Sequence, residues 1–461
     1  MRLARRITSH ALVLACVFTS LLILAAAPAA DEGNDDLLRA PEKSLDPRIQ
    51  PERITEQAPP PPPEQMVLPL PPDHRIAASP DQVPVSEAHW QRAVEAIGKG
   101  LAYLRAQQDE SGGWMTEMMA APTDEPDKPS PIAVAVTALA VKAIVQVEPE
   151  ARSTPQLQRA IRFIYAAQNE NGSFEGGALT NYVTSTVVSA LASLDDPAFG
   201  KDIRSGAGWL QRNQWDQSEG LSPRQDWFGG AGYGNHGRPD LSNTQMMLEA
   251  LYDAGLDPDE PAFQRALTFL TRTQNLRETN KADWAGRDGG FIYTAANGGE
   301  SMASEYAGEG RHGEDLPPEA PRSLRSYGSM TYAGFKSLLY AGLSPDDVRV
   351  RAAFDWIRRH FTFQENPGLG DQGLYYYFHA MSRALRVAQQ HTIADVDGEE
   401  HNWREELIDA IIARQNEDGS WKNTADRWLE SRPVLATVYC ILSLEEVLKP
   451  VEKAEGDEHA G

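Results

Sequence analysis

The chain has 461 residues and a formal net charge of −23 at pH 7. Such a charge repels nucleic acid and anionic lipid surfaces, so we expect no nucleic-acid partner. Cys440 is the only cysteine beyond the first 30 residues. No internal disulfide can form there, and the fold must be held by its core, which a chain of this length can supply.

Residues 1–30 have the three parts of an export signal. Arginines come first, an apolar run covers residues 11–27, and small residues follow at 27–29. We predict a cleaved signal peptide. An uncleaved signal anchor is the alternative, because the run is long enough to span a membrane. The protein is therefore expected to be exported, as a periplasmic, secreted or membrane-anchored chain, with membrane contact only through that anchor.

Residues 31–86 are rich in proline and acidic residues, with "APPPPPEQMVLPLPPD" at their centre. They lack periodic apolar residues and are predicted to form a disordered linker. Residues 451–461 are predicted to be an acidic tail. One folded region, residues 87–450, lies between them.

This folded region repeats as six predicted helix pairs. The first helix of each pair is amphipathic, as in the spacing of Leu101 and Leu104. These helices end near a glutamine in every unit, at Gln108, Gln168, Gln214, Gln274, Gln364 and Gln415. The second helices are more apolar and are expected to lie inside. An open stack needs caps at its ends, whereas a closed ring needs none. We therefore predict an all-α fold, a single α/α toroid of about twelve helices in two rings.

A short motif follows three of the first helices: "QDESGGW" at 108–114, "QNENGSF" at 168–174 and "QNEDGSW" at 415–421. Its glycine can adopt the left-handed conformation that ends a helix, and its aromatic residue can fold back onto the helix. The motif is therefore interpreted as a structural joint. In the units of Gln214, Gln274 and Gln364, insertions are expected to have displaced the glycine and the aromatic residue.

The spacing Q-x3-G-x-W/F resembles the QW motif of squalene and oxidosqualene cyclases. The wider repeat resembles the prenyltransferase and squalene oxidase repeat family over residues 90–448, which implies an α/α toroid. The usual catalytic motifs of these relatives are missing. The sequence has no D-x-D-D acid, and "DPDE" at residues 257–260 is expected to be a turn. Cys440 has no neighbouring His or Asp to complete a prenyltransferase zinc site. Whether the chain is an enzyme is left open.

In a closed ring, all connections from a first to a second helix lie at one end. The long loops of this chain are connections of that kind. We predict that a ligand cavity opens at the mouth built by residues 215–240, 275–325 and 364–375. Asp226, Asp288 and Asp371 precede glycine and aromatic runs at comparable places. Each either braces a turn or joins an acidic cluster that binds a cation or supplies an acid and a base. No cofactor is predicted, and a divalent metal at this cluster is the one alternative.

The candidate catalytic residues are these three aspartates and His379, which follows three tyrosines; a buried structural histidine is the alternative reading. Candidate ligand-binding residues share aromatic or polar side chains on the mouth loops and second helices. They are Trp227, Tyr233, Asn243, Tyr293, Ser329, Tyr332, Tyr375, Tyr376 and Arg432.

These features predict an exported toroid protein that binds or modifies an isoprenoid or similar hydrophobic molecule without squalene-cyclase-type protonation. One alternative is a non-catalytic binding or scaffold protein. The other is a polysaccharide lyase or hydrolase on the same fold, with a carbohydrate partner. An apolar, aromatic cavity favours a lipid, and an open groove with two carboxylates and an arginine favours a sugar. A cavity plugged by side chains contradicts both.

Overall fold

A computed structural model of the protein describes residues 76, 79–118, 128–175, 177–296 and 324–450. All of them belong to one unit, Pro69–Gly461. The predicted signal, most of the predicted linker and the predicted tail lie outside the described residues. None of the described helices combines the length and the apolarity that a membrane span requires.

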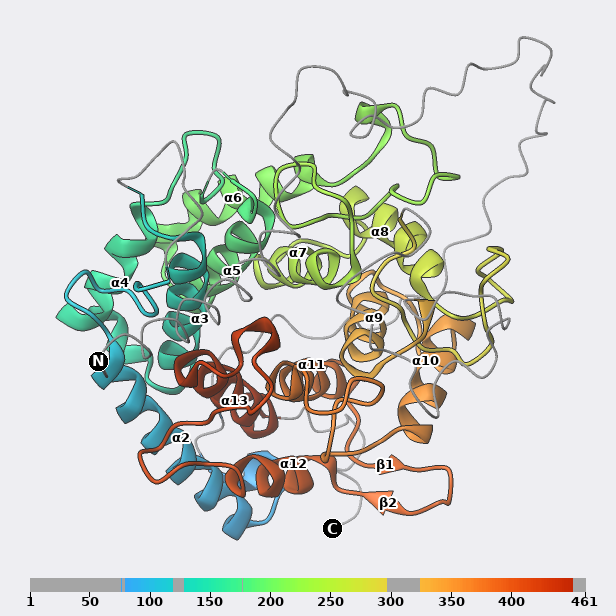
Figure 1. Ribbon diagram of the computed structural model, residues 1–461. Helices are drawn as coiled ribbons and strands as arrows, with labels where there is room; N and C mark the ends of the chain where they lie inside the picture. The colour runs from blue at the N-terminus through green and yellow to red at the C-terminus, as the bar shows by residue number, and fades with distance from the viewer. Residues whose placement is uncertain (1–75, 77–78, 119–127, 176, 297–323, 451–461) are drawn as a thin grey trace, which may run out of the picture. The chain divides into compact units, whose positions relative to one another are not determined.

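Twelve α-helices in the described residues alternate between an outer and an inner layer (Figure 1). The outer helices are α2 (Glu87–Gln107), α4 (Pro155–Tyr165), α6 (Gly200–Asn213), α8 (Pro261–Thr273), α10 (Val348–Arg359) and α12 (Trp403–Ile412). The inner helices are α3 (Pro131–Val147), α5 (Thr180–Ser193), α7 (Leu241–Asp253), α9 (Gly328–Tyr340), α11 (Leu374–Val387) and α13 (Pro433–Leu448).

Each inner helix packs against the next, and α13 packs back against α3, so the inner layer closes. In the outer layer α12 lies beside α2, and Gln415 Nε2 donates to the Ala96 carbonyl of that first helix at 2.9 Å. The inner helices are buried on all sides, as α3 is from Ala133 to Gln146. The prediction of a single all-α toroid with two helical rings is confirmed.

Smaller elements connect the helices. Five 3-10 helices occur in the described residues: η2 (Pro80–Gln82), η3 (Pro149–Ser153), η4 (Pro197–Phe199), η5 (Gln217–Glu219) and η8 (Arg427–Leu429). A two-stranded antiparallel hairpin, β1 (Ile393–Ala394) and β2 (Glu400–His401), lies between α11 and α12 with Ile393 opposite His401. No sequence pattern predicts this hairpin, because neither strand is long enough to show alternation.

The recurring motif forms the joint between neighbouring units. Gly112 has φ +95°, and a Cβ there would lie 2.7 Å from the Arg159 carbonyl oxygen of the next outer helix. Gln108 Nε2 donates to the carbonyls of Gly112 at 2.8 Å and Gln156 at 3.1 Å. The indole of Trp114 donates to Leu104 O at 2.7 Å and so closes the preceding helix. Glycine and glutamine therefore bind α2 to α4, its successor in the outer ring.

Two units that were expected to lack this joint possess it. Gln214 Nε2 donates to Gly229 O at 2.8 Å, and Gln274 Nε2 donates to Gly289 O at 2.9 Å. Both glycines have positive φ, +84° and +83°. The expectation that the insertions displaced the glycine is wrong for these units. The extra residues loop out between the glutamine and the glycine, because only the two ends of the joint need fixed positions.

A threonine on each following inner helix completes the joint in five units. The backbone N–H two residues after the joint glycine donates to its hydroxyl, as from Trp421 to Thr437 at 3.1 Å. The other four acceptors are Thr137, Thr184, Thr244 and Thr331. A buried backbone donor is thereby satisfied, and the inner ring is tied to the outer one.

Candidate functional site

Several inner helices keep partly exposed side chains in their first turns, at the mouth end. Tyr182 on α5, Ser242 and Met246 on α7, and Tyr376 on α11 lie within the first two turns of their helices and keep partial solvent exposure. Beyond those turns the inner helices are almost entirely buried. These partly exposed side chains belong together, because the Tyr376 hydroxyl lies 3.4 Å from Ser242 Oγ.

Six tyrosines surround this space, and we call the group the tyrosine chamber: Tyr182, Tyr233, Tyr293, Tyr327, Tyr376 and Tyr439. The rings of Tyr182 and Tyr233 are 6.3 Å apart, and those of Tyr376 and Tyr439 are 5.9 Å apart. Gln245 Nε2 donates to the Tyr376 hydroxyl at 3.2 Å. Burial raises the pKa of all six phenols, so they remain neutral hydrogen-bonding groups.

Asp240 lies beside the tyrosine chamber at the N-terminus of α7 and is 2% exposed. Its carboxylate accepts from the Asn243 backbone N–H at 2.8 Å and from Asn243 Nδ2 at 2.9 Å. Burial raises the pKa of Asp240 to about 7, although the Asn243 bonds oppose the shift. The carboxyl group is therefore much more readily protonated near neutral pH than an ordinary aspartate. Sequence reasoning missed this residue.

His379 lies at the inner edge of the chamber, where its ring stacks on Tyr439 at 5.9 Å. Burial lowers the pKa of His379 to about 4, so the imidazole is neutral near pH 7. Its Nδ1 has no hydrogen-bond partner. Asp371 is exposed. These two candidate catalytic residues are not joined by a hydrogen bond in the described residues.

Below His379 the interior of the ring is filled by paired charges. We call this group the ion-paired floor, and its members are Lys142, Glu249, Asp253, Lys336, Arg383 and Glu446. Lys142 Nζ lies 3.0 Å from Asp253 Oδ2, and Arg383 bridges Asp253 at 2.5 Å and Glu446 at 3.0 Å. All six are at most 5% exposed. Burial disfavours the charge of Glu249, but Lys336 and Lys142 outweigh it and hold the pKa of that carboxyl low.

Residues 123–291 match the family described as the squalene-hopene cyclase C-terminal domain. That segment of the chain is therefore similar to a terpene cyclase domain. The match confirms the resemblance to the prenyltransferase and squalene oxidase repeat family that the QW-type joints indicated.

Several solved structures are similar to this terpene cyclase-like protein. One is the type II terpene cyclase MstE from Scytonema with its substrate geranylgeranyl dihydroxybenzoate, at 11% identity over 79% of this chain and 99% of that chain, with a TM-score of 0.45. A protein from Actinoplanes is 12% identical over 77% and 99% of the two chains, with a TM-score of 0.33. A glycosidase is 13% identical over 79% and 100%, with a TM-score of 0.40. No curated protein matches the sequence significantly.

Asp240 begins the string D-L-S-N, residues 240–243, which contains a single acid. "DPDE" instead lies at the other end of α7, where Asp257 Oδ1 accepts from the Asp259 N–H at 2.9 Å in a turn, as expected.

The structure does not bring Asp226, Asp288 and Asp371 together. Asp226 and Asp371 are exposed on their loops, and Asp288 accepts from Ser326 Oγ at 2.9 Å. The carbonyl of Asp371, not its carboxylate, binds Asn423 Nδ2 at 2.7 Å. This geometry fits the interpretation in which Asp288 braces a turn, and these three aspartates form no acidic cluster among the described residues of the mouth.

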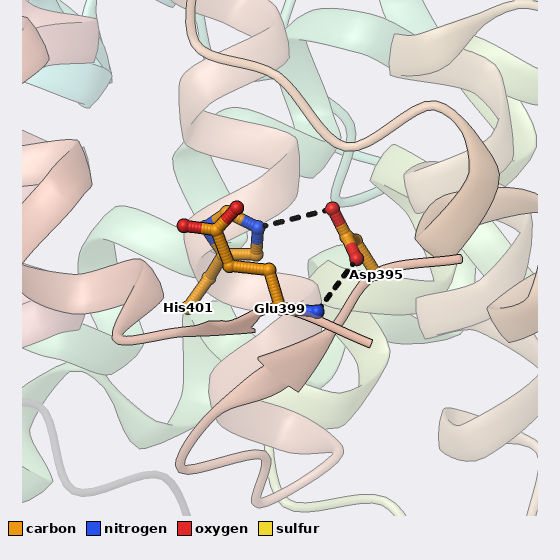
Figure 2. Close-up of side chains that lie close together, drawn as sticks. All are labelled: Asp395, Glu399 and His401. Atoms are coloured by element: carbon orange, nitrogen blue, oxygen red, sulfur yellow. Dashed lines mark hydrogen bonds and ion pairs between the residues drawn. The ribbon is translucent and has the colours of Figure 1, made fainter. Parts of the chain in front are cut away.

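Among the described residues, one group of carboxylates and a histidine has its potential ligand atoms within 4.8 Å of one another: Asp395, Glu399 and His401 on the β1–β2 hairpin (Figure 2). His401 Nε2 lies 3.5 Å from Asp395 Oδ2, and Nδ1 lies 3.0 Å from Glu406. Partial burial lowers the pKa of His401, but Glu406 outweighs it and raises the pKa overall. A protonated His401 paired with these carboxylates accounts for the arrangement without an ion.

The candidate ligand-binding residues divide into two sets. Tyr233, Asn243, Tyr293 and Tyr376 belong to the tyrosine chamber or contact Asp240 within it. The others have different surroundings. Trp227 packs on Trp215, and Tyr332 packs on Tyr377. Ser329 is hydrogen-bonded to Asn366, the Tyr375 hydroxyl donates to Lys422 O, and Arg432 precedes α13.

A second buried acid helps to fix the chamber. Glu430 is 0% exposed and accepts from the backbone N–H groups of Tyr375 at 3.3 Å and Tyr376 at 2.8 Å. Burial raises its pKa to about 7, against the effect of the Asn423 side chain. A carboxylate at this place satisfies the first turn of α11 and so positions Tyr376.

Proposed function

We propose that this terpene cyclase-like protein binds a small isoprenoid or comparable hydrophobic molecule with a polar head, in the tyrosine chamber, and does not cyclise it. The observation that carries the proposal is the partial exposure of Tyr182 and Tyr376 in the first turns of inner helices that are otherwise almost entirely buried. Side chains that keep accessible surface in such a place line a hollow.

The chemistry of the chamber favours an amphipathic ligand. Tyrosine rings provide flat apolar faces, while their hydroxyls provide donors and acceptors. The Tyr376 hydroxyl and Gln245 are joined at 3.2 Å, and the Gln245 Oε1 has no partner. A ligand head with a hydroxyl or carbonyl group would satisfy that oxygen or the hydroxyls beside it. Asp240, with a pKa of about 7, can donate or accept there.

Two features argue against cyclisation. Ser242 and Asn243 occupy the last two places of D-L-S-N, and neither is an acid able to protonate an alkene. Asp240 is a weak acid with a pKa of about 7, and its bonds from Asn243 favour the carboxylate over the acid. In addition, the ion-paired floor limits the depth of the chamber, so a long prenyl chain lacks an apolar cavity.

The N-terminal segment is the basis for a further part of the proposal, that the protein acts outside the cytoplasm. Its arginines, apolar run and small residues carry this part alone.

The test uses the full chain, with the short prenyl alcohol geraniol as the probe and geranylgeraniol as a chain too long for the chamber. Native mass spectrometry and thermal shift should report bound geraniol in the parent protein. Tyr376→Phe should weaken its retention several-fold, because the hydroxyl beside Ser242 and Gln245 is lost. Tyr375→Phe is the matched control, since the Tyr375 hydroxyl points to Lys422 O instead.

The outcomes separate the alternatives. A cyclised product after incubation with either alcohol would refute the absence of catalysis. If neither alcohol is retained or shifts the melting temperature, ligand binding is refuted and a scaffold role survives. Equal losses in Tyr376→Phe and Tyr375→Phe would show that the chamber is not the binding site.

A further inference from the structure

A separate hollow lies against the outer helix α8. Its volume is about 550 Å³, and its wall combines α8 with parts of the loops before and after that helix. Such a volume is in the range of sites for small ligands. We call it the α8 groove and define it by Arg224, Asp226, Thr268, Arg272, Lys281 and Trp284.

The charge of the α8 groove is opposite to that of the chain. Arg224, Arg272 and Lys281 line it with a single carboxylate, Asp226, whereas the chain as a whole carries −23. A fourth cation in the wall, Arg349, is already paired with Asp347 at 2.8 Å. The α8 groove is therefore a cationic site on an acidic protein.

Three of these cations are not neutralised by salt bridges within the described residues. The Arg272 guanidinium donates to the carbonyls of Pro223 and Gln225, and Lys281 Nζ donates to the Glu278 carbonyl at 2.6 Å. Carbonyl oxygens satisfy hydrogen bonds but carry no net charge. Burial lowers the pKa of Arg272, and Asp226 partly offsets this effect. An anionic ligand would supply the missing negative charge.

The α8 groove also offers an aromatic wall. Trp284 packs against the buried cluster of Ile292, Ala295 and Leu324 and is itself only partly buried. An indole fixed on one side by a core presents a rigid apolar face on the other. Thr268 adds a hydroxyl on α8 at the edge of the same hollow.

We propose that the α8 groove binds an acidic oligosaccharide, with a uronate carboxylate at Arg224 and Arg272 and a pyranose face on Trp284. Guanidinium groups match the two oxygens of a carboxylate. The indole face suits the C–H face of a sugar ring, and threonine suits its hydroxyls. A long nucleic acid would meet the repulsion of the surrounding acidic surface, whereas a short acidic glycan fits within the groove.

The test is calorimetric titration of the full chain with tetragalacturonate at low salt, with maltotetraose as the neutral counterpart and tripolyphosphate as an anion without a sugar face. We expect binding of tetragalacturonate, at least ten-fold weaker binding of maltotetraose, and several-fold weakening between 50 and 300 mM salt. Arg224→Gln and Trp284→Leu should each weaken binding about five- to ten-fold.

Lys201→Gln is the matched control, because Lys201 is an exposed cation on α6 and does not line the α8 groove. It makes the same change of charge and should leave affinity unchanged. Leucine at 284 preserves the apolar contact with Ile292, and the melting temperature of each variant verifies its fold. Equal losses in Lys201→Gln and Arg224→Gln would overturn the site. The assignment to an acidic sugar would be overturned if tetragalacturonate did not bind. It would also be overturned if tripolyphosphate bound as tightly as tetragalacturonate and Trp284→Leu had no effect on affinity.

Discussion

Gly112→Ala should destabilise the protein because the joint glycine meets two constraints at once. Its φ of +95° lies in the left-handed half of conformational space, which costs an alanine about 1–2 kcal/mol. The new Cβ would also lie 2.6 Å from the Arg159 backbone carbon and 2.7 Å from its oxygen. Backbone on an outer helix cannot yield cheaply, so overpacking adds about 1–3 kcal/mol. The expected loss is roughly 2–5 kcal/mol.

Two further glycines separate these terms. Gly220 has φ +76° but nothing within 4 Å of its Cβ position, so Gly220→Ala should lose only the conformational part. Gly98 lies in α2 with open space around it, and Gly98→Ala should be neutral or slightly stabilising, by roughly 0.5–1 kcal/mol. At roughly 2 °C per kcal/mol, calorimetry should show Gly112→Ala melting about 4–10 °C below the parent protein. A loss no larger than that of Gly220→Ala would refute the joint's close contact with the next helix.

Three other changes test the interior. Thr437→Val removes the acceptor of the Trp421 N–H and should cost about 1–3 kcal/mol by thermal melting, whereas Thr437→Ser keeps the hydroxyl and should cost less. The folded-state pKa of His379, about 4, lies below its usual value of 6.5. The contribution of the neutral imidazole to the free energy of unfolding is therefore full above pH 6.5 and is lost as pH falls towards 4. His379→Asn should therefore flatten the melting profile in that window, and an unchanged slope would contradict a neutral buried imidazole. Glu445 is fully buried with neither oxygen partnered, and burial raises its pKa well above 4.5. At pH 8 the Glu445→Gln variant should have a higher melting temperature than the parent protein, and near pH 4 the two should be equal. The reason is that the parent carboxyl stays protonated in the folded protein but ionises in the unfolded chain at pH 8, which favours unfolding.

The fold was predictable because its signals are local. Apolar residues three and four apart mark each outer helix, and the Gln–Gly–aromatic joint recurs at a fixed spacing where no insertion intervenes. The spacing fails at Gln214 and Gln274, since each glutamine and its glycine are 15 positions apart in the sequence. A loop of that length preserves the geometry of its ends while removing the sequence pattern that identifies them.

The tyrosine chamber was only partly predictable, because its members come from several units of the ring. Tyr233, Tyr293 and Tyr376 stood out beside glycine-rich runs, whereas Tyr182 and Tyr439 lie within inner helices that look like ordinary core. Asp240 was missed because its D-L-S-N string lacks the acids that define D-x-D-D. Asp226, Asp288 and Asp371 were chosen because they occupy comparable positions along the chain. Position along the chain does not reveal that their surroundings in the folded protein differ.

Net charge is also a property of the whole chain that does not describe the charge of any single site. The value of −23 constrains long-range encounters with large polyanions, but at physiological salt exposed charges are screened beyond roughly 8 Å. A ligand in the α8 groove therefore responds mainly to Arg224, Arg272 and Lys281, which the chain average conceals. Inside the ring, Arg383 is balanced by Asp253 and Glu446 at hydrogen-bonding distance, so that part of the charge is not available to any partner. The chain total thus predicts which large molecules are repelled, while the ligands of each site depend on the few charges within one screening length.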